Sequence, residues 1–146
     1  MPLEGEQLER DEIEKLIPHA GAMVLLDRVI DWGPASIRCW TESHLRLDNP
    51  LRRDDMLPVV AGIEIAAQAM AIHARLTSGG TKAKGVLGSL RDVRLNTDRL
   101  DTCGTALLVY ADLRGGDGRG RVYSFSVRAV DGVNSQLEGR ASVFFL

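Results

Sequence analysis

The sequence lacks the features of several specialised protein classes. It has only two cysteines, Cys39 and Cys103, with no CxxC motif and no histidine at metal-ligand spacing near either. We therefore expect no bound metal, and two buried thiols in a reducing compartment fit this content better than a disulfide. A net charge of -2 provides no basic surface field, which argues against a nucleic-acid partner.

No segment has the pattern of a targeting or membrane-spanning sequence. Residues 1–16 are rich in acids and lack the apolar core of a signal peptide. The longest apolar stretch, residues 61–72, is interrupted by Glu64 and Gln68 and is too short to cross a bilayer. We expect a cytoplasmic protein that does not bind a membrane.

What is present is the composition of an ordinary globular protein. The 146 residues are 45% apolar and 26% charged, which is enough to build a core without disulfide or metal staples. Because no repeat, low-complexity segment or linker divides the chain, we expect a single domain over residues 1–146.

The hydrophobic pattern predicts an α+β fold with an antiparallel sheet. A short helix is expected over residues 8–17, with Asp11 and Glu14 at capping-box spacing, and a long helix over residues 61–76, closed by Ser78-Gly79-Gly80. Strands are predicted over residues 23–32, 36–43, 85–96, 105–114, 121–130 and 136–146, with a hairpin turn at GGDGRG and, at Gly88, a bulge or a point of close approach. Consecutive strands without intervening helices favour an antiparallel sheet over βαβ units.

The long helix carries one acid in apolar surroundings. Residues 61–76 are apolar on nearly every face, which is typical of a buried helix. Glu64 interrupts this pattern, and a buried carboxylate is costly unless it is paired or hydrogen-bonded, for example to Gln68 one turn further on. An acid that merely caps the first turn explains the pattern equally well. The free N–H groups at the helix start form an anion site, and the irregular loop over residues 45–58 precedes it.

Two sequence blocks together resemble a known enzyme family. Pro18-His19, followed eight residues after the histidine by Asp27-Arg28, resembles the PH(x)7DR signature of FabZ-type 3-hydroxyacyl-acyl-carrier-protein dehydratases. Pro58, with Glu64 six residues later and Gln68-Ala69 after that, resembles the second block of the same family. The similarity runs from Leu16 to the last strand, and residues 57–71 are closest to the branch found in aryl polyene pigment gene clusters.

The resemblance implies a hot-dog fold, in which the antiparallel sheet wraps the long helix and two subunits pair. His19 of one subunit and Glu64 of the other would then act as base and acid in dehydrating a 3-hydroxyacyl thioester to the trans-2-enoyl thioester. The N–H groups at the helix start, at Val59 or its neighbours, would hold the thioester oxygen, while Gln68 and Met23 would contact the substrate. The resemblance implies an acyl carrier protein as partner and no cofactor.

Departures from the family affect the substrate pocket and leave alternatives open. Ala22 and Val59 replace a proline and a glycine of the two blocks, and RRDDML at residues 52–57 replaces the usual GHP run. A hot-dog thioesterase, with Glu64 activating water, is one alternative. A non-catalytic subunit that pairs with a related hot-dog chain is the second, and an acyl-binding sensor is a weaker third.

Three further assignments complete the expectations. Arg91, Arg94 and Arg99 are candidates for docking an acidic carrier protein, although exposed strand arginines often have no such role. His44 is assigned to a polar loop and His73 to the exposed edge of the long helix, and neither is expected to be catalytic. The assembly is expected to be a homodimer, a higher even oligomer, or a heteromer with a related subunit.

Overall fold

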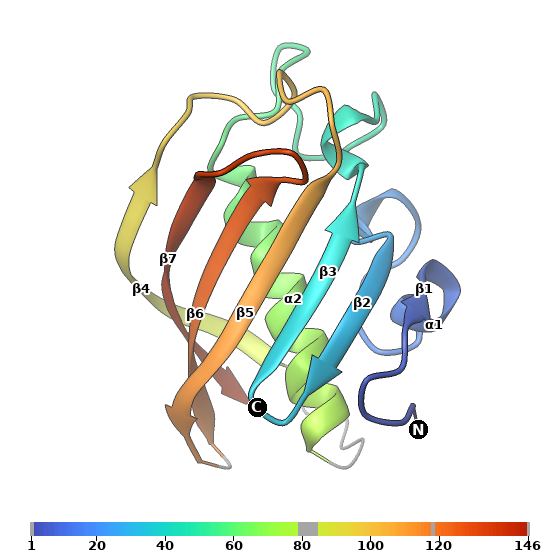
Figure 1. The fold of residues 1–146 in the computed structure, drawn as a ribbon, viewed down its shortest axis with the longest axis vertical. Helices are drawn as coiled ribbons and strands as arrows, with labels where there is room; N and C mark the ends of the chain where they lie inside the picture. The colour runs from blue at the N-terminus through green and yellow to red at the C-terminus, as the bar shows by residue number, and fades with distance from the viewer. Residues whose placement is uncertain (1, 79–84, 118, 146) are drawn as a thin grey trace.

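A computed structural model describes residues 2–78, 85–117 and 119–145 of the chain. A seven-stranded antiparallel sheet curves around one long helix, α2 (Ala61–Thr77), as predicted (Figure 1). The strands are β1 (Leu8–Glu9), β2 (Arg28–Gly33), β3 (Ser36–Thr41), β4 (Gly85–Leu95), β5 (Leu107–Gly116), β6 (Gly120–Ala129) and β7 (Ser135–Phe145). They lie side by side in the order β1-β2-β3-β5-β6-β7-β4.

The concave face of the sheet and α2 share one hydrophobic core. On β6, Tyr123, Phe125 and Val127 are buried, whereas the residues between them are partly exposed, as expected for a strand with one face on the core. Gly62, in the first turn of α2, lies so close to the sheet that an added Cβ would be 2.3 Å from a methyl carbon of Leu137. The predicted bulge at Gly88 is confirmed by the register shift between Leu87 and Ser89.

The first residues differ from the prediction of one helix over residues 8–17. Helix α1 is only Arg10–Glu14, and its capping box is formed by Glu9 and Glu12 instead of Asp11 and Glu14. Leu8 and Glu9 pair with β2 as strand β1, and Leu8 is fully buried there. The backbone pairing with β2 therefore removes these residues from the helix, an effect that helical periodicity does not detect.

The strand predicted over residues 23–32 is also shorter in the structure. Gly21–Met23 forms a single 3-10 turn, η1, and β2 begins only at Arg28. In the segment between α1 and β2, Met23, Val24 and Leu25 bond to side chains from other elements, and among the described residues only the Asp27 N–H donates to a strand, at Trp40 of β3. A second 3-10 turn, η2 (Ser43–Leu45), follows β3 and starts the long loop before α2.

One flank of α2 is open, which corrects the prediction of a helix buried on all sides. Val60, just before the helix, is 51% exposed, Glu64 is exposed, and Ala67, Ala71 and Arg75 are partly exposed. This spacing follows one helical stripe, because the chain's own sheet covers only the opposite side of α2. Strand β4 ends the sheet, and within the described residues its outer edge has no strand partner.

Burial settles two other sequence expectations, those for His73 and for the cysteines. His73 is fully buried, so its prediction at an exposed helix edge is wrong; it bonds to the Tyr123 hydroxyl at 2.8 Å and to the Gly33 carbonyl at 2.7 Å. Cys39 and Cys103 are free thiols, the first buried and the second partly exposed. The predicted ending of α2 at Gly79-Gly80 lies outside the described residues. Within the described part of the chain, no helix has the length and apolar character needed to cross a membrane.

Candidate active site

His19 lies on a loop between α1 and β2 and is half-buried. Its Nδ1 atom is buried and has no hydrogen-bond partner among the described residues, so this edge of the ring is turned inward. The accessible part of the imidazole is therefore the edge that carries Nε2. A neutral imidazole with one accessible nitrogen can remove a proton from a bound molecule.

The loop that carries His19 is held against α2 by Gln68. The Gln68 amide donates to the Met23 carbonyl at 2.7 Å, and its Oε1 accepts from the Leu25 N–H at 2.8 Å. The side chain is only 1% exposed. Gln68 was predicted to contact substrate, whereas the structure gives it contacts with the loop, because both of its polar atoms face the backbone there. Met23, also predicted to contact substrate, is partly exposed on this loop.

Asp27 is the centre of a polar cluster beside the same loop. Its Oδ1 accepts from Arg10 at 3.0 Å and from Arg46 at 2.8 Å, and its Oδ2 accepts from the Glu42 N–H at 2.7 Å and the Thr41 hydroxyl at 3.1 Å. Burial raises the pKa of Asp27, but the hydrogen bonds from Glu42, Arg46 and Thr41 outweigh it, so the pKa lies below its ordinary value. The carboxylate is therefore ionised at neutral pH.

The start of α2 offers fewer free N–H groups than predicted. The Val59 N–H donates to the Asp98 carbonyl at 3.0 Å, so this N–H already has a partner within the chain. The reason is tertiary: residues 57–59 pair with residues 98–100, through the Pro58–Arg99 bridge, a contact between distant segments.

The next N–H groups along the chain are also used, with one exception. Ala61, Gly62 and Ile63 donate to the carbonyls three residues before them. Within the described residues, the Val60 N–H makes no such bond, and Val60 is 51% exposed. Val60 therefore provides the open backbone donor at this helix start.

Glu64 lies on the open flank of α2, about one turn after Val60. Its exposure corrects the prediction of a carboxylate sunk into the core, because none of the described segments of the chain covers this stripe. Within the described residues, no hydrogen bond or ion pair joins Glu64 to His19. An acid in this position is available to a molecule or chain that covers the flank.

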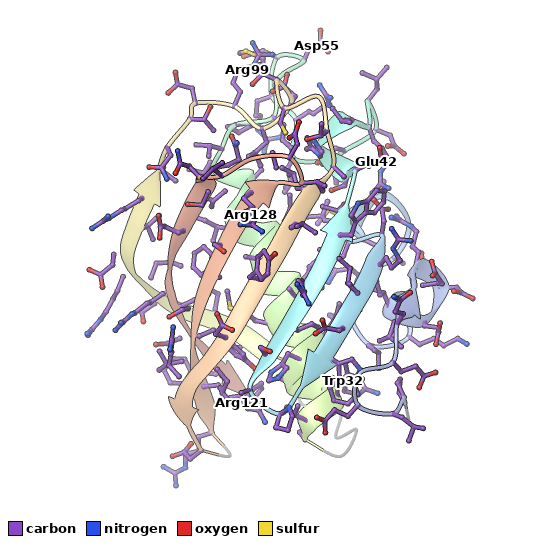
Figure 2. All side chains as sticks on the ribbon, in the orientation of Figure 1. Trp32, Glu42, Asp55, Arg99, Arg121 and Arg128 are labelled. Atoms are coloured by element: carbon purple, nitrogen blue, oxygen red, sulfur yellow. The ribbon has the colours of Figure 1, made fainter. Side chains whose placement is uncertain are left out.

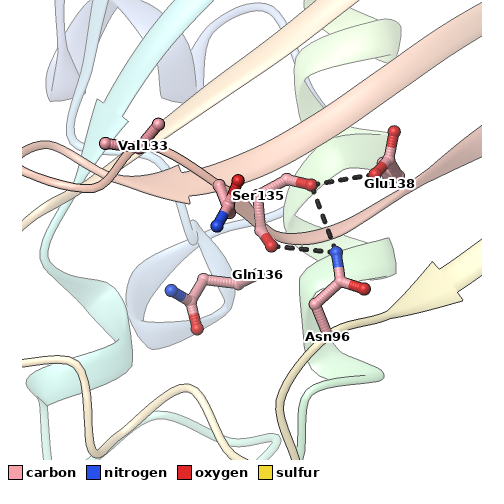
Figure 3. Close-up of a pocket in the computed structure, with 6 residues that line it drawn as sticks. Asn96, Val133, Ser135, Gln136 and Glu138 are labelled. Atoms are coloured by element: carbon pink, nitrogen blue, oxygen red, sulfur yellow. Dashed lines mark hydrogen bonds between the residues drawn. The ribbon is translucent and has the colours of Figure 1, made fainter.

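Two surface hollows of the chain are lined by neither His19 nor Glu64. One, of about 580 Å³, lies at the ends of β4 and β7, where Asn96 donates to Ser135 and Ser135 donates to Glu138 (Figure 3). The other, of about 300 Å³, lies at the opposite end of the molecule beside Trp32 and Arg121 (Figure 2). A single chain thus encloses no cavity in these places for the predicted acid–base pair.

Sequence reasoning missed most of the residues that hold the His19 loop. Asp27 belongs to the first signature block, but its partners Arg10 and Arg46 lie in a short helix and in a loop, where arginines are common. The hydroxyls of Thr41 and Ser43 also donate to the Leu25 carbonyl, at 2.6 and 2.7 Å. No local pattern marks these side chains, because they meet the loop only in the folded chain.

The ApeP-like family, described as ApeP dehydratase, matches residues 11–145. The chain belongs to this family. Membership confirms the predicted resemblance to the dehydratases of the aryl polyene branch, and it supports dehydration over thioester hydrolysis as the family's reaction. No curated protein matches the chain.

Solved structures with the same fold include dehydratases and thioesterases. The dehydratase heterocomplex ApeI:P from Xenorhabdus doucetiae contains a chain that is 22% identical, with a TM-score of 0.79, over 92% of this chain and 90% of that chain. Thioesterase HI1161 from Haemophilus influenzae is 10% identical, with a TM-score of 0.67, over 99% and 95%. Zebra fish thioesterase superfamily member 2 is 13% identical, with a TM-score of 0.65, over 95% and 99%. These similarities confirm the hot-dog fold.

Proposed function

We propose that this chain catalyses the dehydration of a 3-hydroxyacyl thioester, with His19 as base and Glu64 as acid in a site shared by two subunits. The observation that carries the proposal is the exposed acid, beside Val60, Ala67 and Ala71, on a helix flank that no described part of the chain covers and that ends at Arg75. An exposed helix flank that carries several apolar side chains is typical of a surface that another chain covers. A second chain on this flank would bring its own His19 loop, or that of a related subunit, toward Glu64.

The proposed chemistry moves two protons and breaks one carbon–oxygen bond. Nε2 of His19 takes the proton next to the thioester carbonyl, and the electron pair forms the enolate. The Val60 N–H donates to the enolate oxygen as the negative charge develops. The enolate then expels the 3-hydroxyl group, which Glu64 protonates so that it leaves as water. One proton returns from His19 to Glu64 through solvent and restores both groups.

Coverage of the flank has a consequence for the acid. Glu64 is exposed to water in the single chain. A covering subunit would enclose this carboxyl group together with the bound substrate. The same coverage would exclude bulk water from the enolate. The proposed site is therefore competent only in an assembly.

The assembly can be a homodimer or a pair with a related hot-dog chain. The similar structure from Xenorhabdus doucetiae is a heterocomplex, which favours the second arrangement for this chain. Size measurement by light scattering, with this chain alone and mixed with a related dehydratase subunit, distinguishes the two. A monomer under both conditions would contradict the shared site.

The acyl group is proposed to arrive on an acyl carrier protein, which is acidic. Arg91 and Arg94 are exposed on β4, whereas Arg99 is paired with Asp101 at the helix-start end of the molecule (Figure 2). Charge reversal at Arg91 or Arg94 is expected to raise KM for the carrier-bound substrate and leave kcat unchanged. An unchanged KM would exclude these arginines from carrier docking.

The test of the function is steady-state turnover of one carrier-bound 3-hydroxyacyl thioester by the assembled protein. An enoyl thioester product indicates dehydration, and a free thiol indicates hydrolysis. His19→Ala and Glu64→Gln are each expected to lower kcat on the order of 100- to 10 000-fold. Glu42→Gln removes another exposed carboxylate and serves as the matched control, with normal turnover expected. Full activity in His19→Ala would refute the proposal, and inactivity of the wild-type assembly would indicate a non-catalytic subunit.

A further inference from the structure

The backbone of the His19 loop is held at its carbonyl oxygens. Arg10 donates to the Gly21 carbonyl at 2.9 Å, Gln68 to the Met23 carbonyl at 2.7 Å, and Arg46 to the Val24 carbonyl at 3.1 Å. These donors come from α1, from α2 and from the long loop, so the His19 loop is fixed from three directions. Such a loop can hold a side chain within the small tolerance that proton abstraction requires.

Asp27 organises two of these three donors. The guanidinium groups of Arg10 and Arg46 both donate to its Oδ1, so two positive charges approach each other through one carboxylate oxygen. Each guanidinium uses one nitrogen for Asp27 and the other for a loop carbonyl. A planar fork of donors with fixed geometry suits this bridging role. Without the carboxylate, the two arginines would repel each other, and their hydrogen bonds to the Gly21 and Val24 carbonyls would no longer be held in a fixed geometry.

We infer that Asp27 is a positioning residue for His19, acting through Arg10 and Arg46 on the backbone of the loop that carries the imidazole. Asp27 lies eight residues after His19, and its carboxylate is occupied by Arg10, Arg46, Glu42 and Thr41, so it takes no part in the chemistry itself. The inference rests on the proposed role of His19 as the base. It predicts that a change at Asp27 lowers turnover under conditions where the protein is still folded.

The matched pair of variants is Asp27→Asn and Asp31→Asn. Both aspartates lie in or beside β2 and each is paired with arginine, but Asp31 bonds to the half-exposed Arg38 and not to the His19 loop. Asp27→Asn is nearly isosteric, yet it removes the charge and turns one acceptor into a donor that faces the donors around it. Asp31→Asn makes the same chemical change where no loop carbonyl depends on it.

Two measurements on the assembled protein test the inference. Asp27→Asn is expected to lower kcat on the order of 10- to 100-fold with KM nearly unchanged, because a displaced base slows the chemical step. Hydrogen exchange of the amides in residues 20–26 is expected to accelerate in Asp27→Asn and to stay normal in Asp31→Asn. Normal kcat or normal exchange in Asp27→Asn would overturn the inference.

A double variant separates positioning from a general structural effect. In a His19→Ala background, Asp27→Asn is expected to lower the residual turnover no further, because its effect passes through the imidazole. A further loss as large as that in the wild-type background would overturn the inference. If His19→Ala keeps full activity, or the wild-type assembly does not dehydrate, the proposed function fails instead, and the exchange experiment still decides whether Asp27 orders the loop.

Discussion

Replacing Gln68 by leucine should destabilise the protein strongly, because it removes both hydrogen bonds between α2 and the His19 loop. The change would leave the buried Leu25 N–H and the partly buried Met23 carbonyl without partners. Each unsatisfied group costs about 1–3 kcal/mol, so the free energy of unfolding should fall by about 2–6 kcal/mol. This is a large share of the stability of an ordinary domain.

Urea unfolding followed by circular dichroism measures this loss. With a slope of about 2 kcal/mol per M, the midpoint should move down by about 1–3 M while the slope stays constant. Gln136→Leu is the control, since Gln136 lies on β7 at the edge of the polar hollow and points away from Asn96 (Figure 3). Equal midpoint shifts in the two variants would refute the structural role of Gln68.

Gln68→Glu tests the same two contacts with the His19 loop through the dependence of folding stability on pH. One carboxyl oxygen would accept from the Leu25 N–H, but the other would face the Met23 carbonyl and needs a proton to bond to it. Folding should therefore raise the pKa of the introduced carboxyl above its unfolded value of about 4.3. Stability is then retained below about pH 4.3 and is lost as the pH rises through the folded-state value. A difference from wild type that is the same at pH 5 and pH 7.5 would contradict this geometry.

Three further predictions concern two histidines, the two cysteines and one glycine. Burial lowers the pKa of His44 and of His73, so the unfolded state binds more protons than the folded state below about pH 6.5. The free energy of unfolding should therefore fall as the pH drops from about 6.5 through the folded-state pKa values. Replacing both histidines by glutamine should reduce this dependence on pH, as measured by urea titrations at pH 5 to 7.5. Burial raises the pKa of Cys39, so a thiol reagent should modify Cys103 in the native protein and Cys39 only after unfolding; equal native rates would contradict this. Gly21 has a φ of 61° with open space around it, so Gly21→Ala should cost about 1–2 kcal/mol from backbone strain alone, and an unchanged urea midpoint would exclude that strain.

Much of the fold could be predicted because local patterns carry it. The alternation on β6, the apolar run of α2 and the glycine-rich turn between β5 and β6 are properties of neighbouring residues. The exceptions are places where a distant segment takes over the backbone. Leu8 and Glu9 are not part of the first helix, contrary to the prediction, because their backbone pairs with β2.

The candidate site was predicted only in part, for the same reason. His19 and Glu64 were predicted because the two sequence blocks that contain them resemble blocks of the dehydratase family, a resemblance that does not depend on how the chain folds. The orientation of His19, the use of the Val59 N–H and the partners of Gln68 depend on contacts between residues that are far apart in sequence.

The sequence by itself determined the order of the elements, the long helix, its single acid and the family, because these follow from residue type and spacing along one chain. Only the tertiary structure decided which flank of α2 is open and which N–H at its start is free. It also placed Arg10 and Arg46 on either side of Asp27. The physical reason is that exposure and hydrogen-bond partners are properties of the packed chain. A curved sheet that covers one side of a helix exposes the other, whatever the helix's own hydrophobicity.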